Sequence, residues 1–125
     1  KTLGGKRVYQ IEEGAFYKNT SIKKLIIPDK TVGYIGIGAF ADCTNLAEVS
    51  FGNCVNNISY YAFQNTALTS IRLPSSVEQV LNTAFFHCEK LINVTIDSNN
   101  VHYKAIENVI YKKNGDGTLN LILYP

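Results

Sequence analysis

Four Ala-Phe dipeptides divide this chain into units of nearly equal length. Successive dipeptides are 24, 23 and 22 residues apart. A valine precedes each alanine by seven residues, and an isoleucine or valine follows that valine by three. A period of about 20 to 29 residues, kept over several copies, is typical of solenoids in which each repeat forms one turn. The dipeptides begin at Ala15, Ala39, Ala62 and Ala84.

A second apolar pattern, close to Leu-x-x-Ile-x-Leu, follows each Ala-Phe dipeptide. Its last two apolar residues are two apart, so both point to one face of a β-strand. A single unit cannot bury its apolar residues alone, so the units must stack with parallel strands one above another. We therefore predict an α/β leucine-rich-repeat solenoid with a parallel β-sheet face. About four repeats of 22–24 residues are expected, near residues 8–31, 32–54, 55–76 and 77–98.

The Ala-Phe-x-x-Cys segment of the repeat is too short for a stable isolated helix. We predict that it forms about one helical or 3₁₀ turn. The small alanine allows this turn to pack closely against the core, and the phenylalanine fills the space beneath it. The third repeat lacks the cysteine and is one residue shorter after Phe63.

The repeat pattern stops at Ser98. Two β-rich runs follow, at residues 106–111 and 119–124, and the segment between them contains Asn-Gly and Asp-Gly, which are strong hairpin signals. We predict a β-hairpin within residues 99–125 that covers the open core of the last repeat. Residues 1–125 then form one leucine-rich-repeat domain. No methionine or leader-like segment begins the sequence, so we expect a segment of a larger protein.

Composition argues against two classes of partner. The formal net charge is +2 and the basic residues form no run, so the sequence indicates no basic surface that would bind nucleic acid. No apolar stretch is long enough to cross a bilayer, so we expect no membrane insertion of this segment.

The three cysteines and two histidines do not form a recognisable chemical motif. Cys43 and Cys88 occupy the same position two repeats apart, which places them roughly 10 Å apart, beyond disulfide reach. We predict that both are buried apolar filler, whereas Cys54 is a candidate for a partly exposed, reactive thiol. His87 and His102 fit neither a metal site nor a Cys-His catalytic pair. We therefore predict no enzymatic activity, no cofactor and no metal.

Alternation along each predicted strand leaves two columns of side chains that point away from the core. Solenoid faces of this kind commonly bind partners. The alternative is a face that is merely solvated, because no aromatic anchor or arginine cluster marks a hot spot on it. The predicted partner-binding face consists of Lys24, Ile26, Glu48, Ser50, Ser70, Arg72, Asn93 and Thr95.

Several tyrosines are expected on the turns that connect the strands. Either Tyr60 or Tyr61, which stand just before the third Ala-Phe dipeptide, is a candidate contact residue. The tyrosines concerned are Tyr9, Tyr17, Tyr34, Tyr60 and Tyr61.

Residues 25–43 (LIIPDKTVGYIGIGAFADC) and 68–88 (LTSIRLPSSVEQVLNTAFFHC) resemble the BspA-type leucine-rich repeats. Residues 103–125 also resemble the segment that often connects two repeat arrays in that family. The chain departs from the family pattern at Gly52 and Asp97, where proline is usual, at Leu81, where glycine is usual, and at Asn19, where cysteine is usual. The resemblance covers nearly all of the chain after Arg7.

The resemblance implies a surface or secreted protein of a bacterium or parasitic protist, with adhesion to host proteins or other cells as its role. We therefore predict a non-catalytic protein-protein interaction or adhesion module that is extracellular or on the cell surface. Its partners would be host or neighbouring-cell proteins. A structural spacer that presents another domain is the alternative. The family motif is structural, so it transfers no binding residue to this sequence.

Overall fold

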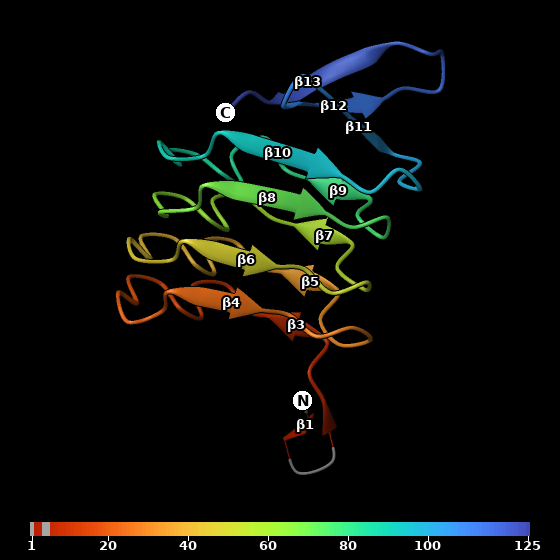
Figure 1. Ribbon diagram of the computed structural model, residues 1–125. Coiled ribbons are helices and arrows are strands. Elements are labelled where there is room, and N and C mark those ends of the chain that lie inside the picture. Colours follow the sequence, from red (N-terminus) through yellow and green to blue (C-terminus); the bar gives the residue numbers. More distant parts are fainter. Residues whose placement is uncertain (1, 4–5) are drawn as a thin grey trace.

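The computed structural model describes residues 2–3 and 6–125, and these form a β-solenoid of about four turns (Figure 1). Each turn contributes two short strands, one to each of two parallel stacks. The first stack is a four-stranded parallel sheet in the order β3 (Gln10–Ile11), β5 (Tyr34–Ile35), β7 (Asn57–Ile58) and β9 (Gln79–Val80). The second contains the parallel pairs of β4 (Lys24–Ile26) with β6 (Glu48–Ser50) and of β8 (Ser70–Leu73) with β10 (Asn93–Ile96). A short antiparallel pair, β1 (Thr2–Leu3) and β2 (Lys6–Arg7), precedes them.

The apolar positions of the repeat align in register and form the core. Ile35 lies opposite Ile58, and Ile58 lies opposite Val80. Phe40 and Phe63 stack with nearly parallel rings whose centroids are 5.3 Å apart. Each of the two rings is fully buried. The stack continues to Phe16 at 5.0 Å and to Phe85 at 5.4 Å, so one phenylalanine column runs through all four repeats.

The residues around each Ala-Phe dipeptide form successive β-turns, and no helix or 3₁₀ segment occurs in residues 2–3 and 6–125. The predicted helical or 3₁₀ turn is therefore not confirmed. In the first repeat, the amides of Ala15 and Tyr17 donate to carbonyls three residues earlier, at 3.2 and 3.0 Å. The amide of Phe16, between them, donates instead to the carbonyl of Ala39 in the next repeat, at 2.8 Å. Because alternate amides donate to carbonyls of the neighbouring repeat, the segment connects two repeats by backbone hydrogen bonds and does not continue as a helix.

Thr66 takes the place of the missing cysteine in the third repeat. Its hydroxyl donates to the carbonyl of Phe63 at 3.0 Å and lies 3.3 Å from the Sγ of Cys88. The Cys88 thiol also donates to the Phe63 carbonyl at 3.0 Å, and the Cys43 thiol donates to the Phe16 carbonyl at 3.0 Å. The column therefore needs a small side chain with a hydrogen-bond donor, which threonine also supplies.

The C-terminal segment is a three-stranded antiparallel sheet in the order β11 (Tyr103–Ile106), β12 (Val109–Lys113) and β13 (Leu119–Leu123). In this sheet, β12 and β13 form a hairpin around the Asn-Gly and Asp-Gly segment, and β11 adds a third strand that was not predicted. The run predicted as one strand, residues 106–111, is interrupted by Glu107 and Asn108, which have φ angles of 48° and 64°. Two successive residues with positive φ form the tight turn that joins twisted antiparallel strands, so this run contains a turn of its own.

Asn100 joins this sheet to the last repeat. The side chain is only 2% exposed, and all of its hydrogen-bonding capacity is used. Its Nδ2 donates to the carbonyls of Pro74 and Val77 at 3.0 and 2.9 Å. Its Oδ1 accepts from the amides of His102 and Tyr103, each at 2.8 Å. The asparagine therefore bonds to one carbonyl on each side of the boundary between the third and the last repeat, and it fixes the start of β11.

Tyr103 makes the second connection. Its hydroxyl accepts a hydrogen bond from the amide of Val80 at 2.8 Å, at the end of the four-stranded sheet where no fifth strand follows. The ring is buried with Ile110 in the hydrophobic core. Burial raises the pKa of the phenol above its ordinary value of 10.0. The hydroxyl thus accepts the hydrogen bond that a backbone carbonyl of a fifth strand would otherwise accept.

Candidate interaction surfaces

The predicted partner-binding face is exposed and in register. Lys24 lies opposite Glu48 on β4 and β6, and Arg72 lies opposite Thr95 on β8 and β10. The remaining members, Ile26, Ser50, Ser70 and Asn93, occupy the corresponding positions on the same strands. All eight side chains belong to exposed residues. The strands that carry them are stacked on one side of the molecule (Figure 1).

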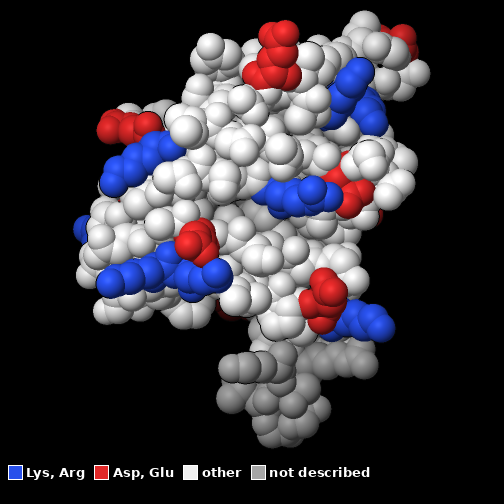
Figure 2. Space-filling model, viewed as in Figure 1, with Lys and Arg blue, Asp and Glu red and all other residues white. Residues whose placement is uncertain are grey.

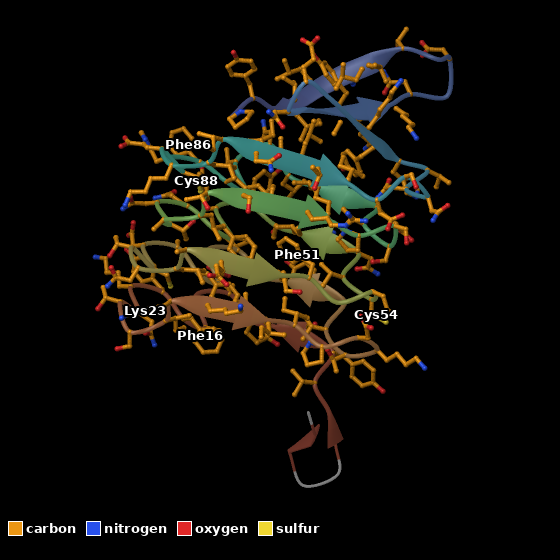
Figure 3. All side chains as sticks on the ribbon, viewed as in Figure 1. Phe16, Lys23, Phe51, Cys54, Phe86 and Cys88 are labelled. Atoms are coloured by element: carbon orange, nitrogen blue, oxygen red, sulfur yellow. The ribbon has the colours of Figure 1, made fainter. Side chains whose placement is uncertain are left out.

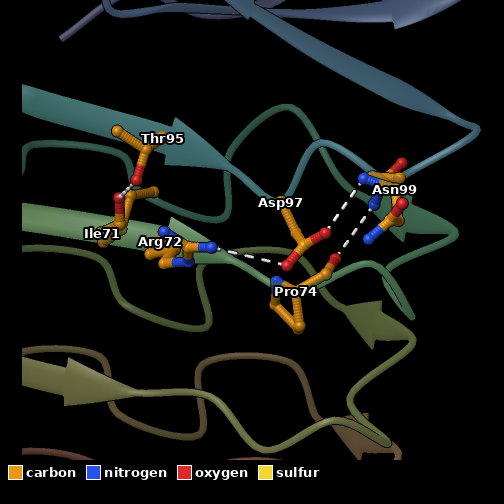
Figure 4. Close-up of polar contacts among 7 residues, drawn as sticks. Ile71, Arg72, Pro74, Thr95, Asp97 and Asn99 are labelled. Carbon is orange, nitrogen blue, oxygen red and sulfur yellow. Dashed lines mark hydrogen bonds and ion pairs between the residues drawn. The ribbon is translucent and has the colours of Figure 1, made fainter.

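The charged members of this face are already paired. The Nζ of Lys24 lies 2.7 Å from the carboxylate of Glu48, and the guanidinium of Arg72 lies 3.4 Å from the carboxylate of Asp97 (Figure 4). A hydrogen bond from the amide of Asn99, followed by the contact with Arg72, lowers the pKa of Asp97. Figure 2 shows opposite charges beside one another on this side of the molecule, with no large patch of a single sign. The face is therefore polar and electrically balanced.

The turns that contain the Ala-Phe dipeptides present a more aromatic surface. Tyr17, Tyr60 and Tyr61 lie in these turns, as predicted, and all three are exposed. The prediction for Tyr34 is wrong, because this residue lies in β5. Tyr9 lies just before β3.

A shallow groove of about 310 Å³ crosses the turns of the first three repeats. We call it the turn groove. Tyr17 from the first repeat and Tyr61 from the third lie along it, and Gly38 and Ala41 of the second repeat also line it. The carboxylates that line it belong to Glu13 and Asp42. The groove was not predicted, because its members come from three repeats and occupy positions that differ from one repeat to the next. The available signal was Tyr61 itself, which stands where the first two repeats have glycine.

An apolar hollow of about 690 Å³ lies at the N-terminal end of the stack. Its lining includes Val8, Ile11, Phe16 and Leu25, which would contact a further repeat if one were stacked on this end. Figure 3 shows Phe16 in the first repeat, at this end of the solenoid, whereas Phe51 lies further up the stack.

The cysteines and histidines form no reactive cluster. Cys43 and Cys88 are buried, as predicted, and burial raises the pKa of both thiols. Cys54 is half-buried in a loop on the side of the solenoid away from Cys88 (Figure 3). Within the described part of the chain, no three His, Cys, Asp or Glu residues gather as metal ligands would. None of the described residues forms a helix long and apolar enough to span a membrane.

Three solved structures resemble this solenoid. A leucine-rich cell-surface protein from Faecalibacterium prausnitzii A2-165 superposes with a TM-score of 0.84 at 33% identity, over 91% of this chain and 29% of that protein. The pneumococcal vaccine antigen PcpA superposes with a TM-score of 0.83 at 27% identity, over 94% of this chain and 28% of PcpA. A leucine-rich-repeat protein from Eubacterium ventriosum ATCC 27560 gives a TM-score of 0.65 at 26% identity, over 85% of this chain and 34% of that protein. The chain thus spans about a third or less of each of these proteins.

The repeat pattern also matches a known family over most of its length. No curated protein sequence matches the chain. The family model described as "BspA type Leucine rich repeat region" matches residues 9–114 in six copies. The matched residues include all four Ala-Phe dipeptides and two strands of the C-terminal sheet. This chain therefore belongs to the BspA-type leucine-rich-repeat family.

Proposed function

We propose that this chain is a non-catalytic protein-interaction segment of a cell-surface or secreted protein, with adhesion to host or neighbouring-cell proteins as its role. The observation that carries the proposal is the strand face, on which eight exposed side chains lie on two pairs of parallel strands, in register within each pair. Family membership and the resemblance to a bacterial cell-surface protein support the same conclusion.

The chemistry of the face suits a specific but modest interaction. Lys24 and Arg72 already have acidic partners within the chain, so a ligand must compete for them or bind the pairs as they stand. Charges at the rim of an interface mainly set the association rate and the specificity. We therefore expect salt-sensitive binding that depends on several repeats together, without one dominant anchor residue.

A structural spacer is the second candidate. The internal pairing of Lys24 with Glu48 and of Arg72 with Asp97 favours it, because a surface that satisfies its own charges needs no partner. A spacer would hold another domain away from the cell, and the isolated chain would then bind nothing.

Binding of the folded chain to immobilised extracellular-matrix proteins and to whole cells separates the two candidates. The test variant carries both Lys24→Glu and Arg72→Glu, and the matched control carries Lys90→Glu, which reverses an exposed charge on a turn. An adhesive face predicts at least about tenfold weaker binding for the double variant and unchanged binding for the control. Unchanged binding by the double variant would show that this face is the wrong site. No binding by the unaltered chain would favour the spacer.

A further inference from the structure

The turn groove combines two features that suit a planar cation. Tyr17 and Tyr61 contribute aromatic rings, and Glu13 and Asp42 contribute carboxylates. Neither carboxylate forms an ion pair with a lysine or arginine among the residues that the structure describes. Both charged pairs of the strand face, in contrast, are internally neutralised. The groove therefore presents negative charge without an internal partner.

The backbone of Tyr61 has a conformation that glycine adopts more easily than tyrosine. Its φ angle is 56°, in the left-handed region that favours glycine. Gly14 and Gly38 occupy the equivalent positions in the first two repeats, with φ angles of 61° and 58°. Glycine adopts this conformation without the steric cost that a Cβ brings. The tyrosine ring is also 42% exposed, so it adds little to the core.

The ring of Tyr61 is fixed from outside the groove. Phe86, which does not line the groove, packs edge-on against it with a centroid separation of 6.4 Å. Asp42 is also partly fixed, because its Oδ1 accepts a hydrogen bond from the Nδ2 of Asn65 at 2.9 Å. Its Oδ2 has no donor in the part of the chain that the structure describes. One aromatic wall and one carboxylate are thus preorganised, which reduces the entropic cost of binding.

Of the cations that a protein partner carries, arginine fits these features best. Its guanidinium is planar, stacks on aromatic rings and forms charge-assisted hydrogen bonds with carboxylates. Lysine carries a compact, strongly hydrated charge and lacks the planar surface. The groove is shallow, and its volume of about 310 Å³ accommodates one long side chain.

We propose that the turn groove binds the guanidinium of an arginine side chain on a partner protein, with Tyr17 and Tyr61 stacking against it and Glu13 and Asp42 accepting its hydrogen bonds. The inference rests on the proposed interaction function, because the arginine belongs to a partner protein. It adds a second contact surface, beside the strand face, that selects partners with an exposed arginine. The Nζ of Lys18 lies 5.1 Å from the ring centroid of Tyr17, so the guanidinium must displace this lysine or stack on the other face of the ring.

Titration of the whole chain with acetyl-Gly-Arg-Gly-amide tests the proposal directly, with NMR signals of Ala41, Tyr17 and Tyr61 as the readout. We expect saturable shifts with a dissociation constant on the order of 1 to 10 mM, as befits a single side chain. The same peptide with citrulline, which keeps the shape and removes the charge, is expected to give no saturable shift. Tyr61→Gly is expected to weaken binding at least about fivefold while the chain unfolds at the same or a higher temperature. Asp42→Asn is expected to weaken binding by a similar factor, and the matched control Tyr124→Ala to leave it unchanged.

Three results would overturn the proposal: equal binding of the citrulline peptide, equal binding by Tyr61→Gly, or no shift with the arginine peptide up to about 50 mM. Shifts of the same signals by cellobiose, with none from the arginine peptide, would assign the groove to a saccharide instead. The arginine peptide tests the turn groove alone, whereas the matrix-protein experiment tests the strand face. A negative titration therefore does not count against the proposed interaction function, and a negative matrix-protein experiment does not count against the turn groove.

Discussion

At the C-terminal end of the solenoid, polar side chains take the place of a missing repeat, whereas at the N-terminal end part of the apolar column remains open. Asn100 and Tyr103 bond to the backbone of the last repeat and are each only 2% exposed. Phe16, the first ring of the phenylalanine column, is 39% exposed, although Phe40 directly above it is fully buried.

The difference shows where the stability of this fold resides. Phe16 and Phe40 belong to equivalent positions in equivalent repeats, so their burial differs only because Phe40 has a repeat on each side. Burial and hydrogen bonding are therefore properties of the stack and not of the single unit. The C-terminal end becomes stable only when something outside the repeat supplies the missing partners.

The largest expected effect compares these two phenylalanines. Phe40→Ala removes a fully buried ring between two stacked neighbours, and we expect it to lower the free energy of unfolding by about 3 to 5 kcal/mol. Phe16→Ala removes a ring that contacts only one ring of the column, and we expect a loss of about 1 to 2 kcal/mol. Urea unfolding followed by circular dichroism measures both. Phe40→Leu serves as the second variant if Phe40→Ala does not fold. Equal losses at the two positions would contradict the dependence on stacking.

Asn100→Ala tests the C-terminal end. The change leaves the carbonyls of Pro74 and Val77 and the amides of His102 and Tyr103 without their partner. We expect a loss of about 3 kcal/mol in the same urea experiment, because buried polar groups left unsatisfied are costly. Asn99→Ala, at the exposed neighbouring position, is the matched control and should change stability by no more than about 0.5 kcal/mol. A loss as small as that of the control would show that water replaces the asparagine without cost.

A smaller effect is expected at alkaline pH. Burial raises the pKa of Cys43 and Cys88 above the ordinary thiol value of 9.0, and that of Tyr103 above 10.0. The folded chain therefore holds these protons at a pH where the unfolded chain has released them. The stabilisation is fully present below about pH 9 and is lost as the pH rises through the folded-state values.

Unfolding midpoints measured from pH 7 to pH 11 check this expectation. Cys88→Thr should reduce the alkaline loss without a large change at pH 7, because Thr66 already occupies the same column. A midpoint that falls equally in both proteins would assign the alkaline loss to other groups.

The interior of the solenoid was predictable because every core position recurs. Ile35, Phe40 and Val55 each have counterparts one period away, so the repeat pattern alone identified them as core residues. The turns were less predictable. Whether the amide of Phe16 bonds within its own segment or to Ala39 depends on the neighbouring repeat, which no local pattern describes.

The C-terminal sheet lies outside the repeat, and the turn groove is lined by residues that differ from one repeat to the next, so sequence reasoning missed the details of both. Glu107 and Asn108 adopt positive φ without the glycine that usually marks such a turn, so Asn108, a residue type that tolerates positive φ, was the one weak signal that the first β-rich run is divided. Exposure of the strand face followed from alternation along each strand. The pairing of Arg72 with Asp97 did not, because Asp97 lies beyond the strand pattern.

Amide hydrogen exchange at Val80 tests most directly the claim that side chains replace the missing repeat. The Val80 amide donates to the Tyr103 hydroxyl at 2.8 Å, whereas the nearby Leu81 amide donates to the Ile58 carbonyl at 3.0 Å and does not involve the tyrosine. In the unaltered chain, we expect both amides to be strongly protected. In Tyr103→Phe, protection at Val80 should fall at least about tenfold more than at Leu81, because only the Val80 amide loses its acceptor. Equal protection of Val80 in the two proteins would contradict the account.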